Sequence, residues 1–387
     1  MNKPTTLCYK KFSIMLMVMI LLSGIIFAGP VSQYGHLYVD GNRIKSSVTS
    51  QPVQLKGFNT HGLQWFPLHE DTVGNMVNTF GIQVIRAAMY VYEWDAAKNR
   101  AAGYLGDDGW VINQVKMVIE KAIDNDIYVI VDWHMHWGRD IDPVTGGVQN
   151  TPFTSQAQAF FYDLANTYYN GKSYKQYANL IWEPMNEPED GYGIYWSDIR
   201  THANAVIDTL MGTDDANKNL ILVATPRWCQ DLNAVVSDSS TERPDRKYPG
   251  ANIAYTFHFY TGTHFFQGDV TNAANSIPLF CSEFGFSQSW GGGDYNSANA
   301  ANWKTVLDAN MISWCNWNFS NKVEESAALV GFSTDLVMNE ADWAANRDNR
   351  QSGPWDDSVI TDSGKRVREW IGDTASTSAP TSVPTVA

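Results

Sequence analysis

Two glutamates stand at the ends of otherwise apolar runs and are the first candidates for chemistry. Glu187 closes the run Asn179–Glu187, and Glu283 lies in the run Pro278–Gly285. A buried carboxylate is costly unless it is paired or hydrogen-bonded, so either residue alone could simply form a stabilising ion pair. Two of them on separate runs, each among other polar residues, favour a functional pair. Facing carboxyls of different pKa suit glycoside hydrolysis, in which one acts as an acid and the other is ionised.

Other residue types support this chemistry and weaken its rivals. Arg86 could keep one carboxylate ionised through its fixed charge, and Tyr260 could donate a hydrogen bond to it. The sequence contains no HExxH zinc helix, no GxSxG elbow and no P-loop. His134 and His136 have the spacing of a metal pair on a strand, but without an evident third ligand they are better read as histidines lining a cleft. We therefore expect no metal and no cofactor.

The elements that must position these residues alternate along the chain. Short β-branched and aromatic runs, typical of strands, are separated by amphipathic stretches typical of helices. The eight runs are Val53–Thr60, Gln83–Tyr90, Tyr128–His134, Asn179–Glu187, Asn219–Thr225, Asn252–Tyr260, Pro278–Gly285 and Ser313–Ser320. Alternating strands and helices imply a parallel sheet, and eight units in roughly 340 residues fit a (β/α)8 TIM barrel. An open doubly wound sheet is the alternative, but no GxGxxG turn follows the first run.

Three helical faces are visible between the runs. One is formed by Val111, Val115, Val118, Ile119 and Ala122; a second by Ile199, Ala203, Val206, Ile207 and Leu210, with Gly212 as its C-cap; and a third by Phe161, Leu164, Ala165 and Tyr168. Polar and aromatic residues instead gather where the runs end, among them Asn59, His61, Arg86, Tyr90, His134, Asn186, Glu187, Trp228, His258, Tyr260, Glu283 and Trp317. The carboxyl ends of barrel strands form the active-site face, so these side chains should meet there.

Composition and the two ends of the chain indicate the kind of partner, the cellular location and the bounds of the folded domain. Of 387 residues, 27 are Lys or Arg and 41 are Asp or Glu, a net charge of −14 that argues against nucleic acid as a partner. Lys10 and Lys11 precede an apolar stretch, which predicts a signal peptide over residues 1–29, with an uncleaved anchor as the alternative. Residues 374–387 are mostly Thr, Ser, Pro, Ala and Val, as in a disordered tail or linker. Residues 30–373 remain as one catalytic domain.

Three cysteines lie in that domain: Cys229, Cys281 and Cys315. An odd number in an exported protein leaves at least one free thiol. Cys281 and Cys315 fall on adjacent predicted strands, with Cys281 predicted to face the same side as Glu283. They could meet inside the barrel, although two buried free thiols are favoured over a bond.

The sequence Asn186-Glu187-Pro188, with Glu283 after a hydrophobic strand, resembles glycoside hydrolase family 5, and in particular its bacterial endoglucanases of subfamily 2. Further segments resemble that group in the same order: His61-Gly-Leu-Gln-Trp65, Ile85-Arg86-Ala-Ala-Met-Tyr90, Val131-Asp-Trp-His134, His258-Phe-Tyr260 and Trp317-Asn-Phe-Ser-Asn-Lys322-Val-Glu324. The matches run from about Val53 to Glu324, across all eight predicted strands.

The resemblance implies a role for each residue. Glu187 would be the acid/base and Glu283 the nucleophile of a retaining mechanism. Arg86 and Tyr260 would hold Glu283, Asn186 would bind the sugar 2-hydroxyl, and His134 and His258 would line the −1 subsite. Trp317 would form the floor of that subsite through a cis peptide to Asn318. His61, Trp65, Tyr90, Lys322 and Glu324 would bind sugar on the glycone side, and Trp228 would stack a sugar on the leaving-group side.

Some positions depart from the family pattern. Pro184 falls inside the fourth predicted strand, where a proline removes a ladder donor, so a bulge or irregular pairing is expected. Phe284 replaces a common Trp and Cys229 a common Ser. None of these changes removes a reacting group.

The sequence thus predicts a secreted, extracellular endo-β-1,4-glucanase, a monomer whose partner is β-glucan polysaccharide, without membrane association after signal cleavage. A β-mannanase, xyloglucanase or mixed-linkage glucanase on the same scaffold is the nearest alternative, and Lys322 and Glu324 favour glucan among these. A non-catalytic glucan-binding protein is a third possibility, but such a protein would be expected to have lost one of the two glutamates.

Overall fold

A computed structural model describes residues 28–95, 100–106, 109–137, 151–189, 193–212, 218–331 and 352–372. The predicted signal peptide, apart from residues 28 and 29, and the predicted tail lie outside these residues. Among the described helices, none combines the length and apolar character needed to cross a bilayer.

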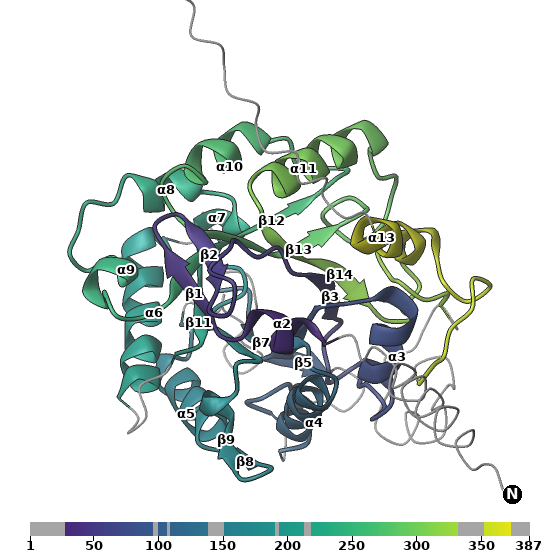
Figure 1. Cartoon of the computed structure of the whole chain (residues 1–387), viewed down its shortest axis with the longest axis horizontal. Coiled ribbons are helices and arrows are strands. Elements are labelled where there is room, and N and C mark those ends of the chain that lie inside the picture. The colour runs from purple at the N-terminus through teal and green to yellow at the C-terminus, as the bar shows by residue number, and fades with distance from the viewer. Residues whose placement is uncertain are drawn as a thin grey trace, which may run out of the picture.

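Eight parallel strands close into a barrel in the order β10-β11-β12-β13-β14-β3-β4-β7. They are β3 (Lys56–Thr60), β4 (Val84–Tyr90), β7 (Tyr128–His134), β10 (Leu180–Glu183), β11 (Leu220–Ala224), β12 (Ile253–Tyr260), β13 (Leu279–Gly285) and β14 (Ser313–Phe319). Closure confirms the predicted (β/α)8 barrel over the open sheet. Figure 1 shows most of the helices arranged as a ring around these strands.

Each barrel strand lies within one of the eight predicted runs, and the largest difference is at β10. The predicted run continued to Glu187, but the strand ends at Glu183 because Pro184 has no N–H to donate. The chain then rejoins β7: the backbone N–H of Asn186 donates to the Trp133 carbonyl at 3.2 Å, and that of Glu187 to the Met135 carbonyl at 3.0 Å. The irregularity at Pro184 therefore lies three residues before Glu187.

Within the described residues, further helices and small strands precede, connect or follow the barrel strands. The helices are α2 (Pro30–Tyr34), α3 (Thr72–Phe80), α4 (Trp110–Asp124), α5 (Thr154–Ala165), α6 (Trp196–Met211), α7 (Pro226–Cys229), α8 (Leu232–Val236), α9 (Pro244–Lys247), α10 (Gln267–Ala273), α11 (Ser297–Ala309) and α13 (Asp362–Gly372), with the 3-10 turn η1 (Tyr174–Gln176). Three antiparallel pairs complete the fold: β1 (Leu37–Asp40) with β2 (Arg43–Ser46), β5 (Glu93–Asp95) with β6 (Arg100–Ala102), and β8 (Tyr168–Tyr169) with β9 (Lys172–Ser173).

The predicted faces of α4 and α6 are buried as expected. Gly212 is the C-cap of α6, with φ of −78°, so it does not use the left-handed region. The third predicted face extended too far, because α5 ends at Ala165 and Tyr168 lies exposed on β8. The pair Tyr168–Tyr169 and Lys172–Ser173 instead forms a hairpin around Asn170 and Gly171, both at positive φ.

Apolar side chains form two main layers. The larger lies between the barrel and the helices, and the smaller fills the barrel interior towards the strand starts, where Leu37 and Ile44 of the β1–β2 hairpin pack against it. Figure 1 shows this purple hairpin lying across one mouth of the barrel. The opposite mouth, at the strand carboxyl ends, is left for polar side chains.

The three described cysteines are buried free thiols. Cys315 belongs to the interior layer, but Cys281 packs in the layer between the barrel and the helices. The expectation that Cys281 faces the same side as Glu283 was therefore wrong. A register shift between Cys281 and Phe284, where β13 meets β14, breaks the regular alternation of side chains.

Candidate active site

Arg86 of β4 is the centre of a fully buried polar cluster. Its guanidinium reaches Glu183 at 2.5 Å, Asp132 at 3.1 Å and Glu283 at 3.0 Å. Burial alone would lower the pKa of Arg86, but the three carboxylates raise it well above its usual value. A permanently charged guanidinium with several directed N–H groups can hold Glu283 in one orientation.

The Glu283 carboxyl accepts one hydrogen bond at each oxygen. Tyr260 Oη donates to Oε1 at 2.7 Å, and Arg86 donates to Oε2 at 3.0 Å. Burial raises the pKa of Glu283 to about 7, assisted by the charge of Glu187, while His258, Arg86 and the Tyr260 hydroxyl act in the opposite direction. The hydrogen bonds from Arg86 and Tyr260 both favour the ionised form of Glu283, as a nucleophile requires.

Glu187, in the segment after β10, has a different environment. His258 Nδ1 lies 2.8 Å from one of its oxygens and His136 Nε2 lies 3.6 Å from the other. Burial lowers the pKa of His258 to about 4, so its ring is neutral near pH 7. Its second nitrogen lies 2.9 Å from Ser282 Oγ, which orients the ring towards Glu187.

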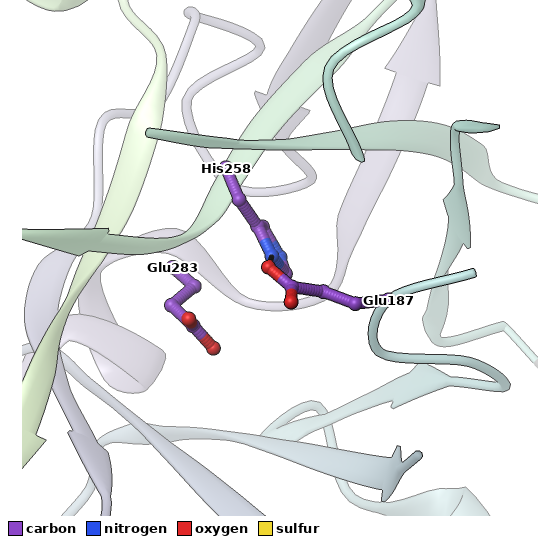
Figure 2. Close-up of side chains that lie close together, drawn as sticks. All are labelled: Glu187, His258 and Glu283. Carbon is purple, nitrogen blue, oxygen red and sulfur yellow. Dashed lines mark hydrogen bonds and ion pairs between the residues drawn. The ribbon is translucent and has the colours of Figure 1, made fainter. Parts of the chain in front are cut away.

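The two carboxyls converge at the mouth of the barrel. Figure 2 shows Glu283 on one side and Glu187 with His258 on the other. One atom from each of Glu187, His258 and Glu283 lies within 4.8 Å of the others. A short carboxyl separation is typical of retaining glycosidases, since inverting ones hold their carboxyls about 6.5–9.5 Å apart to admit water.

A flat surface lies beside this pair. The ring of Trp317 stacks on His134 with centroids 5.3 Å apart, and Tyr90 lies 4.2 Å from His134 on another side. The Trp317–Asn318 peptide is cis, as the resemblance implied. His134 is fixed by Asp132 Oδ2 at 2.6 Å from its Nδ1, and burial lowers its pKa well below the usual value, so the ring is neutral.

One edge of the mouth carries a polar pair from the loop after β14. Lys322 Nζ lies 2.7 Å from Glu324 and 3.3 Å from His61 Nε2. The His61 ring lies 5.2 Å from that of Trp317, and Trp65 packs on Tyr90 at 4.9 Å. The residues predicted to bind the glycone side thus lie next to one another and next to Trp317.

Trp228 lies on the other edge, in an unusual backbone turn after β11. Arg227, Trp228 and Cys229 all have positive φ, of 59°, 54° and 59°. Left-handed geometry is unfavourable for such residues, by roughly 1–2 kcal/mol each. The turn is fixed by the Trp228 N–H, which donates to the Pro188 carbonyl at 2.9 Å, and by the Cys229 thiol, which donates to the Asn186 carbonyl at 3.1 Å. Trp228 is thereby held, half-buried, next to the segment that carries Glu187.

Residues 46–323 match the family model of cellulase (glycosyl hydrolase family 5). The chain belongs to glycosyl hydrolase family 5. An endoglucanase of Clostridium saccharobutylicum is 34% identical over 362 residues, which cover 92% of this chain and 69% of that protein. Endoglucanase C of Evansella cellulosilytica is 32% identical, covering 86% of this chain but 41% of its own length. Among solved structures, the catalytic domain of Thermobifida fusca endoglucanase Cel5A matches with a TM-score of 0.68 at 26% identity, covering 89% of this chain and 100% of that one.

Sequence reasoning about this family 5 chain missed the residues beneath the mouth. Asp132 and Glu183 are fully buried partners of Arg86. Asn59, which was expected at this face, accepts from the same guanidinium through its Oδ1 at 2.8 Å. The sequence could have identified both carboxylates, because Asp132 and Glu183 are charged residues inside otherwise apolar predicted strands. The two histidines with metal-pair spacing have different partners: His134 Nδ1 contacts Asp132, and His136 Nε2 lies 3.6 Å from Glu187.

Proposed function

We propose that this family 5 chain is an endo-β-1,4-glucanase that cleaves internal bonds of β-glucan with retention. The observation that carries the proposal is the convergence of Glu187 and Glu283, each in a different electrostatic environment. Arg86 and Tyr260 favour an ionised Glu283, whereas Glu187 faces a neutral His258. The similar proteins are named endoglucanases, and their similarity extends over most of this chain, in agreement with this activity.

In the first step, Glu283 attacks the anomeric carbon while protonated Glu187 donates its proton to the departing glycosidic oxygen. A covalent glycosyl-enzyme forms and the leaving-group sugar departs. In the second step, the Glu187 carboxylate takes a proton from water, which attacks the same carbon and releases Glu283. Two inversions at one carbon retain its configuration.

Asn186, the residue before Glu187, supports the proposal through its side-chain amide. Its Oδ1 accepts from Arg86 at 2.8 Å, which orients the amide. Its Nδ2 is buried and has no hydrogen-bond partner among the described residues. A buried donor without a partner is costly, so a ligand oxygen would relieve it. We assign this donor to the 2-hydroxyl of the sugar attacked by Glu283.

The aromatic and charged residues of the mouth would position the chain. Trp317 provides the floor under the reacting sugar, with His134 beside it. His61, Trp65, Tyr90, Lys322 and Glu324 bind the glycone side, and Trp228 stacks a leaving-group sugar. Aromatic faces pack well on the apolar faces of pyranose rings, at about 1 kcal/mol each judged from aromatic pairs. The polymer would cross the mouth from the β14 loop to the β11 loop.

A polymer substrate also suits export, and we propose that residues 1–29 are a cleaved signal peptide and residues 374–387 a flexible tail beyond the catalytic domain. Secretion would place the enzyme where insoluble or large glucans occur. Mass spectrometry of protein recovered from the medium of an expressing host would reveal the new N-terminus; an intact N-terminus in the cell pellet would contradict this part of the proposal.

The test of the activity is reducing-sugar release from a polymer panel by the wild type and by Glu283→Gln. We expect release from carboxymethyl cellulose and mixed-linkage glucan, and a loss of about 10³-fold or more in the variant because it removes the nucleophile. Glu242→Gln, at an exposed residue, is the matched control. Near-normal activity of folded Glu283→Gln would refute the mechanism, and preference for galactomannan or xyloglucan would replace the substrate.

A further inference from the structure

The loop between β13 and α11 exposes a large aromatic side chain that none of the assignments above uses. Trp290 is 70% exposed although its loop is tightly folded. The Gly291 N–H donates to the Gln288 carbonyl at 2.9 Å, and the Gln288 N–H donates to the Gly292 carbonyl at 3.0 Å. Trp290 is therefore presented to solvent by a defined turn.

Glycine is required beneath the ring. A Cβ atom at Gly292 would lie 1.9 Å from the Trp290 ring, so the indole packs directly on the backbone of this residue. Gly291 and Gly293 have φ of 89° and 74°, the left-handed region that other residues avoid. The turn sequence therefore supports the indole against the backbone while most of its surface remains open.

The same turn is joined to the glycone edge of the mouth. The Ser326 N–H donates to the Gly291 carbonyl at 3.0 Å, and the Gly293 N–H donates to Glu325 at 3.2 Å. A Cβ at Gly291 would lie 2.9 Å from Glu324 Oε2, so the backbone beside Trp290 touches the Lys322–Glu324 pair. A series of contacts thus leads from Trp317 to His61, from His61 to the Lys322–Glu324 pair, and from Glu324 to the backbone beside Trp290.

We propose that Trp290 is a stacking platform for one further glucose ring, beyond the ring bound by Lys322 and Glu324 on the glycone side. This inference rests on the proposed function. An open indole supported from below offers the flat apolar surface that the C–H face of a pyranose covers, and it adds no polar requirement on the sugar. Trp290 would thereby favour longer glucan chains without contributing to the chemistry.

Two oligosaccharides separate this role from a structural one. Cellotriose can be cleaved with two rings on the glycone side and one beyond the scissile bond, so it need not reach Trp290. Cellopentaose can place a third glycone ring there. The variants are Trp290→Ala, Trp290→Phe and, as the matched control, Tyr168→Ala. Tyr168 is 72% exposed, but it follows α5 and precedes β10, at the end of the barrel where the strands start.

We expect Trp290→Ala to lower kcat/KM for cellopentaose about fivefold and for cellotriose less than about twofold. Trp290→Phe should retain most of the cellopentaose rate, and Tyr168→Ala should match the wild type on both. Equal losses on the two substrates, or no loss on cellopentaose from a variant with wild-type melting temperature, would overturn the inference while leaving the proposed function intact. Failure of the wild type to cleave any cello-oligosaccharide or carboxymethyl cellulose would overturn the proposed function, and the platform with it.

Discussion

The two ends of the barrel interior are built on the same strands and differ in almost every physical respect. Towards the strand starts, Val84, Ile130 and Ile181 pack in a buried apolar layer beneath the β1–β2 hairpin. Two residues further along the same strands stand Arg86, Asp132 and Glu183, all fully buried and ionisable. One step of the strand alternation thus separates a layer that stabilises the fold from one that orients reacting groups.

This difference shows which part of the barrel offsets the unfavourable free energy of burying the charged groups. Burying a guanidinium with three carboxyls strains the electrostatics, and burial raises the pKa of Asp132 to about 7 despite the opposing effect of Arg86. Buried ion pairs are weak sources of stability. The apolar layer and the outer core must therefore supply the stability that lets the polar layer hold its geometry.

The largest expected effect comes from a substitution at the polar end of the barrel, and it should change activity but not stability. Glu187→Gln should lower kcat on carboxymethyl cellulose by about 10²–10⁴-fold, because the amide cannot protonate the departing oxygen. The loss in the bond-breaking step should be much smaller on an aryl β-cellobioside whose leaving group needs no proton. Pre-steady-state release of the aryl group measures this step. Equal losses on both substrates would contradict the acid role of Glu187.

The matching change at the apolar end should affect stability alone. Ile181→Ala removes a buried side chain from the interior layer and should lower the free energy of unfolding by about 2–5 kcal/mol. Denaturant titration measures this loss, while kcat of the folded variant should stay within about twofold of the wild type. A large fall in kcat would show that the two layers are mechanically coupled, and the contrast drawn between them would fail.

The smallest expected effect is a shift in the pH dependence of activity, which tests the electrostatics of the polar layer. The Tyr260 hydroxyl stabilises ionised Glu283, so Tyr260→Phe should raise the pKa of Glu283 further above its ordinary value. Because Glu283 must be ionised to attack, activity on the acid side should be lost at higher pH, by about one pH unit.

The pH dependence of kcat/KM on a soluble glucan measures this shift. Tyr169→Phe is the control, since that hydroxyl donates to Asp124 on the outer surface. An unmoved acid limb in Tyr260→Phe would exclude the hydrogen bond as a determinant of the pKa of Glu283.

Much of the barrel could be predicted because its signals are local. The run Tyr128–His134 matches β7 at both ends, and the buried face of α4 consists of the five residues that its periodicity indicated. The helix α5 ended sooner than its apolar spacing suggested, because Asn166 and the hairpin at Asn170 divert the chain. Endings of this kind depend on backbone geometry that side-chain spacing does not encode.

The candidate site was predictable as a set of strand ends, but its supports were not. Asp132 and Glu183 lie inside apolar runs, and only closure of the barrel brings both to the Arg86 guanidinium. The orientation of Cys281 was misjudged for a related reason: the register shift in β13 depends on pairing with β14. Contacts between distant strands decide both features, so spacing along one strand cannot reveal them.

The three buried thiols can also serve as intrinsic probes of local unfolding. Burial raises the pKa of each thiol, so each stays unreactive until its surroundings open. Cys229 lies beside the mouth, Cys315 in the interior layer and Cys281 outside the strands. Alkylation rates of the individual cysteines, resolved by peptide mapping, would therefore measure how often each of these three regions opens in the native protein. An oligosaccharide seated in the mouth should slow labelling of Cys229 most, which would read occupancy without following catalysis.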